Sequence, residues 1–275
     1  MRKEAFGMTI PFRHMNKAVL ALLIGILITA CATAPGEKGS IAPDPSILRV
    51  GVSSDAPPLI YRQNEKITGL EAELAANLAE YLNKTAVFVE LAWDQQIPAL
   101  VDNRIDIIMS GMSITPARQY QIAFSKPYFK SGLMILVKDL PKYAFIKTPE
   151  TVLAQSITWR IGVVKDTTGE AFIRQKSTGA KAIRAYENQD AALSDLIAGR
   201  IDVFVYDAPM VLRLAVLHQS EGVRPLPVML NEEYLAWGIA KSNPDLLASV
   251  NEFIEHANRQ GQMQTIIKRW IPLAQ

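Results

Sequence analysis

The chain has 275 residues, and 49% of them are apolar, which suffices for a large core and for two domains of roughly 100 residues each. Its formal net charge of +2 comes from 29 basic and 27 acidic side chains, but residues 1–30 hold four of the basic and one of the acidic ones. The remaining chain, with 25 basic and 26 acidic side chains and no basic run, argues against nucleic-acid binding.

Residues 18–30 form an apolar run behind a basic N-terminal segment. The run is too short to span a bilayer and has the length of a signal-peptide core. Cys31 is the only cysteine and follows Leu-Ile-Thr-Ala at 27–30, an order that resembles the lipobox of bacterial lipoproteins, whose cysteine becomes lipid-modified after cleavage. An ordinary signal peptide with an incidental cysteine is the alternative. We therefore expect residues 1–30 to be a lipoprotein signal peptide and the protein to be lipid-anchored in the cell envelope, facing the periplasm or the cell exterior.

Residues 31–45 are rich in Ala, Pro, Gly and polar residues without periodicity, and we predict a flexible tether there. Because the body that follows has no cysteine, no disulfide and no cysteine-ligated metal site is expected in it. Neither a metal-ligand spacing nor a Ser-His-Asp order presents itself, so we expect no metal, no cofactor and no catalytic residue.

The folded body is predicted to begin with a β-α-β-α-β unit. Its elements are expected as strands at 47–52, 86–91 and 105–109, a helix at 70–82 with its apolar residues on one face, and a helix from Asp94 as cap through 101. This order predicts a parallel sheet with helices on its faces.

The pattern then recurs. Arg-Val-Gly-Val at 49–52 is echoed at 160–163, and Asn-Arg-Ile-Asp-Ile-Ile at 103–108 is echoed at 199–204. Between the second pair we expect a helix starting near Thr168, a strand at 181–185 and a helix at 189–198 closed by Gly199. Chance similarity of buried strands explains either match alone, but both in the same order predict two similar α/β lobes.

The expected lobe boundaries follow from this repeat. We assign residues 46–134 with 238–275 to the first lobe and residues 135–237 to the second. The runs at 131–137 and 235–240 are predicted to cross between them, and helices at 244–258 and 262–270 are predicted to pack on the first lobe. Two crossings make a hinge of paired strands, which permits closure.

A stretch after the third strand predicts an anion site. Met-Ser-Gly-Met-Ser-Ile-Thr-Pro-Ala-Arg at 109–118 offers Thr115 as an N-cap and Pro116 at the first helical position. Free amides, a positive helix end and the Arg118 guanidinium would then point to one place, which suits a carboxylate or a phosphate.

A fixed anion is expected opposite. Ligands of open parallel sheets lie beyond the carboxyl ends of the strands, and that rule collects the loops 53–58, 110–118 and 165–168 together with Asp207. One cation and one anion facing each other complement an α-amino acid zwitterion, whereas the acid disfavours phosphate.

These motifs, with Phe-Ser-Lys-Pro-Tyr at 124–128 and Gly-Val-Val-Lys-Asp-Thr-Thr at 162–168, resemble the family 3 extracellular solute-binding proteins, the polar amino acid receptors of ABC importers. The resemblance covers residues 47–270. It implies a type II periplasmic binding protein (Venus-flytrap) of the α/β class, with two Rossmann-like lobes joined by a two-strand hinge. It also implies a monomeric, non-enzymatic protein that closes around an amino acid and delivers it to the permease subunits of an importer.

The resemblance also implies residue roles. Arg118 would bind the ligand α-carboxylate, and Asp207 would bind the α-ammonium. The assisting groups would be the backbone N–H of Ser113 and of Thr168 for the carboxylate, the Gly111 carbonyl and the Ser113 hydroxyl for the ammonium, Trp93 as a wall against the ligand side chain, and Ser110, Ser53 and Tyr61 around them.

Each residue has a plainer interpretation. Arg118 and the loop charges Lys165 and Asp55 are interpreted alternatively as solvated. Asp207 and Thr168 are alternatively helix caps, Trp93 a hydrophobic staple, and Tyr61 and Tyr128 core aromatics.

Two departures from the family pattern bear on specificity. Ser53 stands where histidine, arginine or glutamine receptors often carry an Asp, which favours a polar uncharged or aromatic-compatible ligand. Glu71 and Glu73 replace the usual acids of Gly-Phe-Asp-x-Asp, which is expected to affect packing more than binding.

The enzyme alternative is a cyclohexadienyl (arogenate or prephenate) dehydratase on the same fold. As the resemblance implies, that enzyme has a catalytic Glu three residues beyond the equivalent of Asp207, where this chain has Met210, which cannot transfer a proton. His218 and His256 lie on predicted helices away from the cleft loops, and we interpret them as structural. An amino acid sensing module is the second alternative.

Overall fold

The computed structural model describes residues 44–272. The predicted signal peptide, Cys31 and nearly all of the predicted tether lie outside these residues. Across 44–272, every helix is too short or too polar to cross a membrane.

The first sheet confirms the predicted β-α-β-α-β unit. Its strands, in spatial order, are β5 (Thr85–Glu90), β1 (Ile47–Val52), β6 (Ile107–Ile108), β15 (Gly238–Ile239) and β7 (Ala123–Phe124). The first three are parallel, β15 pairs antiparallel with β6, and β7 pairs antiparallel with β15. The helices of this part are α1 (Leu70–Tyr81), α2 (Gln96–Val101), α3 (Pro116–Gln121), α8 (Pro244–Arg259) and α9 (Gln262–Trp270). We call this sheet with its helices the first lobe.

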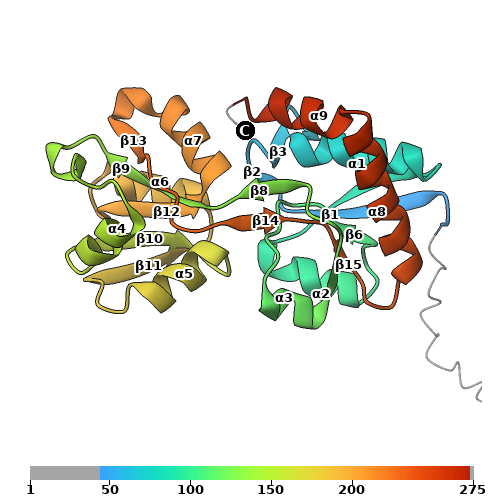
Figure 1. Ribbon diagram of the computed structural model, residues 1–275, viewed down its shortest axis with the longest axis horizontal. Helices are drawn as coiled ribbons and strands as arrows, with labels where there is room; N and C mark the ends of the chain where they lie inside the picture. The colour runs from blue at the N-terminus through green and yellow to red at the C-terminus, as the bar shows by residue number, and fades with distance from the viewer. Residues whose placement is uncertain (1–43, 273–275) are drawn as a thin grey trace, which may run out of the picture. The chain divides into compact units, whose positions relative to one another are not determined.

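A second sheet repeats the arrangement. Its strands, in spatial order, are β11 (Ala182–Tyr186), β10 (Arg160–Val164), β12 (Val203–Asp207), β9 (Leu133–Lys138) and β13 (Val223–Leu226). Its helices are α4 (Pro149–Ser156), α5 (Thr168–Lys176), α6 (Gln189–Ile197) and α7 (Ala208–Leu217). We call this part the second lobe; Figure 1 shows it in green, yellow and orange around β10 and β12. The predicted α/β fold with two lobes is confirmed.

The sequence repeat has a structural cause. In the first lobe the Arg49 backbone N–H and Nε both donate to Oδ2 of Asp106, at 2.7 and 3.1 Å. In the second lobe Arg160 makes the same two bonds to Oδ2 of Asp202, both at 2.9 Å. The repeated Arg and Asp therefore join the first strand of each parallel unit to the loop before its third strand. They stabilise the sheets and lie outside the cavity described below.

The repeated glycines serve close packing. A Cβ added to Gly51 would lie 2.3 Å from Cδ1 of Ile105, and one added to Gly162 would lie 2.4 Å from Cδ1 of Ile201. Real Cβ atoms do not approach so closely, so a larger residue would force the buried isoleucine or the strand to move.

Two short strands connect the lobes. β8 (Phe129–Ser131) pairs antiparallel with β14 (Glu233–Leu235), and Figure 1 shows this pair between the two sheets. The predicted crossing runs at 131–137 and 235–240 were therefore placed too late in the chain. The apolar run in β9 is buried in the second sheet instead, and β15 belongs to the first sheet, because both are apolar enough to fill sheet interiors.

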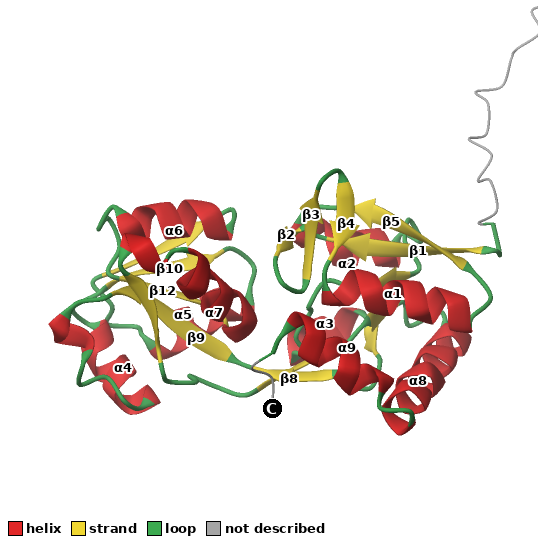
Figure 2. Cartoon of the chain, turned by 90° about the horizontal axis from the view of Figure 1, so that it is seen from above, coloured by secondary structure: helices red, strands yellow, loops and turns green. Residues whose placement is uncertain are grey.

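A third, three-stranded sheet was not predicted. It consists of β2 (Asp55–Ala56), β3 (Ile60–Gln63) and β4 (Lys66–Thr68), all antiparallel. Asn64 and Glu65 form the turn between β3 and β4 with φ of 48° and 66°, the left-handed pair that a tight hairpin requires. Figure 2 shows this sheet beside β1 and β5.

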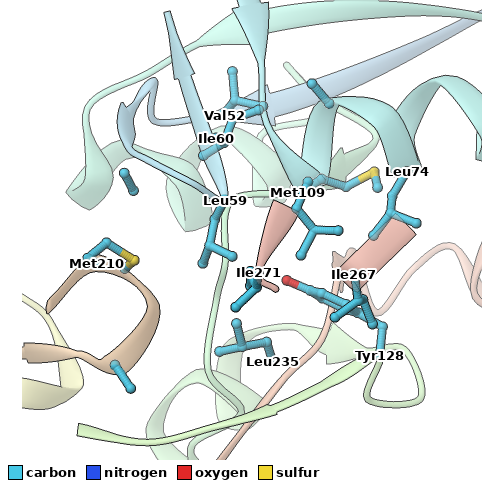
Figure 3. Packing of buried hydrophobic residues seen from close by; sticks show 14 of the residues in the cluster. Val52, Leu59, Ile60, Leu74, Met109, Tyr128, Met210, Leu235, Ile267 and Ile271 are labelled. Carbon is cyan, nitrogen blue, oxygen red and sulfur yellow. The ribbon is translucent and has the colours of Figure 1, made fainter. Parts of the chain in front are cut away.

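The C-terminal helices pack on the first lobe as predicted. α8 and α9 contact α1 and each other (Figures 1 and 2). Val250, Phe253 and Ile254 of the predicted apolar face are buried, while Leu246 and Leu247 are only partly covered. Figure 3 shows part of this core, including Leu74, Met109, Tyr128 and Ile267, with Met210 of α7 at its edge.

Candidate functional site

A cavity lies where the strands of both lobes end. Its lining from the first lobe comprises Ser53, Asp55, Ala56, Trp93, Ser110, Gly111, Ser113 and Arg118, and its lining from the second comprises Val164, Thr167, Thr168, Glu187, Tyr206, Asp207 and Met210. Most of these residues lie at or just beyond the carboxyl ends of the parallel strands β1, β5, β6, β10, β11 and β12, as the carboxyl-end rule predicts. Eight of the nine predicted ligand residues line the cavity. Their roles in binding stay predictions.

Arg118 is held at the start of α3. The Thr115 side chain accepts from the Arg118 backbone N–H at 3.2 Å and Pro116 occupies the first turn, so the predicted helix start is confirmed. The guanidinium donates to the Ser113 carbonyl at 2.9 Å and to the Asp166 carbonyl of the second lobe at 3.3 Å. Both acceptors are carbonyl groups without a net charge, so they leave the positive charge of Arg118 unneutralised. In the part of the chain that the structure describes, no carboxylate lies within 4.0 Å of this cation.

The surroundings of the guanidinium fix its orientation. The Trp93 ring lies 5.2 Å from the Arg118 guanidinium carbon, a cation–π contact, and the indole Nε1 donates to the Asp166 carbonyl at 2.9 Å. Burial lowers the pKa of Arg118, while the nearby charges of Asp207 and Glu233 oppose that shift. The side chain nevertheless remains a cation at every physiological pH.

Asp207 ends β12 and precedes α7. It has the backbone position of an N-cap, but its side chain makes no capping hydrogen bond, so the plain interpretation as a cap is not supported. Burial, and secondarily the charge of Glu233, raise the pKa of Asp207 to about 7, while Arg118 acts in the opposite direction. A carboxylate that is destabilised in this way gains most from a bound cation.

The start of α5 corrects a second capping interpretation. Thr167, one residue earlier than considered, is the N-cap, and its hydroxyl accepts from the Glu170 N–H at 3.3 Å. Thr168 is thereby free of capping. Its hydroxyl donates instead to Oε2 of Glu233 at 3.0 Å.

Glu233 is a site residue that sequence reasoning missed. It lies on the connecting strand β14, is 8% exposed, and accepts hydrogen bonds from the Ser113 and Thr168 hydroxyls through the same oxygen, Oε2. Its Oε1 accepts from the Asn231 side chain at 2.8 Å. The only sequence signal was an acidic pair, Glu-Glu at 232–233, directly before an apolar run.

The loop after β1 is tied to the loop after β6. The Ser53 backbone N–H donates to the Ser110 hydroxyl at 2.8 Å, and the buried Gln96 side chain donates to the Ser53 hydroxyl at 3.1 Å.

The predicted Asp94 cap is wrong. Trp93–Gln95 form a short 3-10 helix (η1) ahead of α2, and no capping side-chain bond is made at either start.

Tyr61 is the predicted site residue that the structure does not place in the lining. It lies on β3, and its ring stacks 5.4 Å from the guanidinium carbon of Arg213 on α7. The hairpin that sequence reasoning did not foresee carries the ring away and puts its partner Asp55 into the lining instead. Asp55, interpreted as a solvated loop charge, is therefore a candidate contact.

Glu71 stabilises the Gly111 loop of the cavity from the protein interior. It is fully buried and accepts from the Gly111 backbone N–H at 2.7 Å, the Tyr128 hydroxyl at 2.6 Å and the Trp237 indole at 2.8 Å. Burial raises its pKa, and the three donors oppose that shift. This residue was expected to affect packing more than binding, but it also holds the Gly111 loop.

Other functional groups lie elsewhere. His218 bonds to Glu221 at 3.0 Å, the His256 ring lies tilted at 5.7 Å from the Tyr81 ring, and neither histidine lines the cavity. Residues 44–272 contain no group of three or more His, Cys, Asp or Glu arranged to hold a metal ion.

Comparison with known proteins agrees with this geometry. Residues 48–273 match the sequence profile of the bacterial extracellular solute-binding proteins, family 3. The chain is 30% identical over 263 residues to the L-cystine-binding protein TcyJ of Escherichia coli (strain K12), covering 93% of each chain.

Two solved structures are similar throughout the described body. One is an ancestral amino acid-binding protein described as a precursor of cyclohexadienyl dehydratase, with a TM-score of 0.74 and 33% identity over 82% of this chain and 96% of that one. The other is an ancestral arginine-binding protein bound to arginine, with a TM-score of 0.74 and 28% identity over 82% of this chain and 98% of that one.

Proposed function

The chain belongs to the family 3 bacterial extracellular solute-binding proteins, and we infer from this that it binds an amino acid as the solute-binding component of an ABC importer. The observation that carries the inference is the pair Arg118 and Asp207, which line one cavity from opposite lobes. Neither charge has an ion-pair partner among residues 44–272. A zwitterion supplies both missing partners at once.

The mode of binding follows from the positions of these groups. The guanidinium of Arg118 would hold the α-carboxylate with the help of the backbone N–H groups of Ser113 and Thr168, and Asp207 would hold the α-ammonium beside the Gly111 carbonyl and the Ser113 hydroxyl. Because these contacts come from both lobes, a bound ligand stabilises the closed arrangement by its differential affinity for it.

A thermal-shift panel of the standard amino acids and L-cystine tests the function. A ligand that binds only the folded state raises the melting temperature, by an amount that grows with its concentration over Kd. A panel in which no amino acid raises the melting temperature would refute the proposed function.

The charges of the cavity favour a ligand with a second cationic group. After Arg118 and Asp207 are matched to the zwitterion, the lining still contains Asp55 and Glu187. Glu187 pairs with Lys165, whereas the ion pairs of residues 44–272 leave Asp55 without a partner. Arginine, lysine or the second ammonium of cystine would supply it, so we replace the uncharged ligand expected from Ser53 with this class. Larger shifts from phenylalanine and glutamine than from these three would contradict it.

A dehydratase activity is the alternative, because one similar structure is described as a precursor of that enzyme. Met210 lines the cavity on α7 and is 3% exposed. Its thioether neither donates nor accepts a proton in catalysis. We therefore propose a protein without catalytic activity. Turnover of prephenate or arogenate by the purified protein would contradict this.

We also propose that Cys31 carries a lipid that anchors a monomeric protein to the membrane, where the closed form docks on the permease. Cys31→Ser should move the protein from the membrane to the soluble fraction and abolish incorporation of radiolabelled palmitate. Unchanged fractionation would leave an ordinary signal peptide as the better interpretation. A sensing module would instead couple the same closure to a signalling partner, and loss of amino acid uptake on gene deletion distinguishes the two.

A further inference from the structure

Glu233 occupies a junction that the zwitterion site does not explain. It comes from β14 and so belongs to the connection between the lobes. Its Oε2 accepts from Ser113, whose loop follows β6 of the first lobe, and from Thr168 at the start of α5 in the second, 3.0 Å away. One carboxylate oxygen thus bonds hydroxyls from both sides of the cavity.

The second oxygen of this carboxylate fixes it in place. Asn231 donates to Oε1 at 2.8 Å, and the Asn231 side-chain oxygen accepts from the Leu133 backbone N–H of β9 at 2.8 Å. Both carboxylate oxygens therefore have donors, as a side chain that is only 8% exposed requires. The side chain of Glu233 is thereby tied to the second sheet through Asn231, while the backbone of its strand is tied to the first-lobe loop by the bond from the Ile114 N–H to the Tyr234 carbonyl at 2.9 Å.

We propose that Glu233 is a positioning residue that holds the two lobes together at the ligand site, through the Thr168 hydroxyl of the second lobe, and orients the Ser113 hydroxyl of the first lobe for the ligand. This rests on the proposed function, since Ser113 and Thr168 are ligand contacts in it. A hydroxyl has one hydrogen to donate. With that hydrogen directed to Glu233, the Ser113 oxygen presents only lone pairs to the cavity, and lone pairs are what an ammonium group needs.

Other contacts across the cavity are weaker candidates for this role. Trp93 and Arg118 donate to the Asp166 carbonyl, and Gln189 donates to the Asp55 carbonyl at 2.9 Å. The Trp93 and Gln189 bonds join neutral groups, and the Arg118 bond, which is charge-assisted through its donor, is the longest at 3.3 Å. The bonds to Glu233 have a buried carboxylate as acceptor, and the Thr168 bond is shorter, at 3.0 Å. Charge-assisted hydrogen bonds are about twice as strong as those between neutral groups.

The chain offers a matched control in the adjacent residue. Glu232 lies on the other side of the same connecting segment, is paired with Lys130 at 2.6 Å and accepts from the Tyr234 hydroxyl. Glu232→Gln removes the same charge one residue away without touching either lobe's hydroxyls. Glu233→Gln keeps the shape of the side chain but weakens its acceptor and adds an amide donor.

The test measures the distance between the lobes without any amino acid. Spin labels are placed on the exposed positions Glu80→Cys on α1 and Lys181→Cys before β11 in the full chain carrying Cys31→Ser. Pulsed electron paramagnetic resonance then gives the populations of short and long distances. We expect Glu233→Gln to lower the ratio of closed to open molecules about tenfold, because a charge-assisted bond is lost, and Glu232→Gln to leave it unchanged.

The distance measurements test the role of Glu233, and a separate binding measurement tests the proposed function. Equal distance distributions for Glu233→Gln and Glu232→Gln, or a parent protein with no closed population, would overturn the role of Glu233. If Glu233→Gln fails to fold by circular dichroism, Thr168→Val decides, since it removes the second-lobe donor, and an unchanged distribution would overturn the role as well. Binding of L-arginine and of every other amino acid to the unlabelled parent is measured alongside. A parent that binds none of them counts against the proposed function and not against the role of Glu233.

Discussion

Asp207→Asn should make the protein more stable and unable to bind its ligand. The pKa of Asp207 in the folded protein is raised from 3.8 to about 7, mainly by burial and then by Glu233. Ionised Asp207 therefore destabilises the folded state relative to the unfolded one. A shift of this size corresponds to about 4 kcal/mol above pH 7, and asparagine removes the charge while keeping the shape.

The pH dependence gives the prediction its sign. Because the folded pKa lies above the unfolded one, the unfavourable contribution is absent well below pH 3.8, grows as pH rises to about 7 and is constant above it. The stability advantage of Asp207→Asn should therefore be about 4 kcal/mol at pH 8 and fall to under about 2 kcal/mol at pH 5. Urea unfolding at both pH values, without added amino acid, measures it.

Glu252→Gln is the control for this experiment. Glu252 is an exposed carboxylate on α8 that takes part in none of the ion pairs formed by residues 44–272. Its replacement should change stability by less than about 0.5 kcal/mol at either pH. Two results would refute the idea that ionised Asp207 destabilises the folded protein until a cation binds. One is an Asp207→Asn protein that is no more stable than wild type at pH 8, and the other is a stability difference that does not become smaller at pH 5.

Three further substitutions test the site. Arg118→Lys should weaken binding of every amino acid by about 2 kcal/mol or more, because an ammonium cannot reproduce the bidentate guanidinium; unchanged affinity in calorimetry would remove Arg118 from the site. Asp55→Asn should weaken L-arginine binding about tenfold, the loss of one charged contact, and leave uncharged amino acids unaffected; equal losses for both kinds of ligand would indicate a structural effect. Glu71→Gln should lower the free energy of unfolding by about 1–3 kcal/mol, because the amide nitrogen meets donors where the carboxylate accepted them; urea midpoints equal to wild type would contradict that role.

The sequence by itself determined the elements whose signals are local. Helix α9 has the predicted bounds, and β1 and α1 agree with prediction to within a residue, because apolar periodicity and terminal residues are written in neighbouring positions. The repeat of Arg-x-Gly-Val and Arg-Ile-Asp predicted two lobes, and the rule about strand ends brought together Arg118, Ser113, Thr168 and Asp207, which the structure places in one cavity.

Only the tertiary structure decided which residues complete the cavity. Glu233 meets Ser113 across 120 positions of sequence, and no local pattern reports such a contact. Asp55 lines the cavity in place of Tyr61 because both belong to a small sheet that was not predicted. Its strands are two to four residues long, which is too short to leave a periodic signal in the sequence. The crossing strands were misplaced for the same reason, since a three-residue pairing is fixed by its partner in space and not by its own residues.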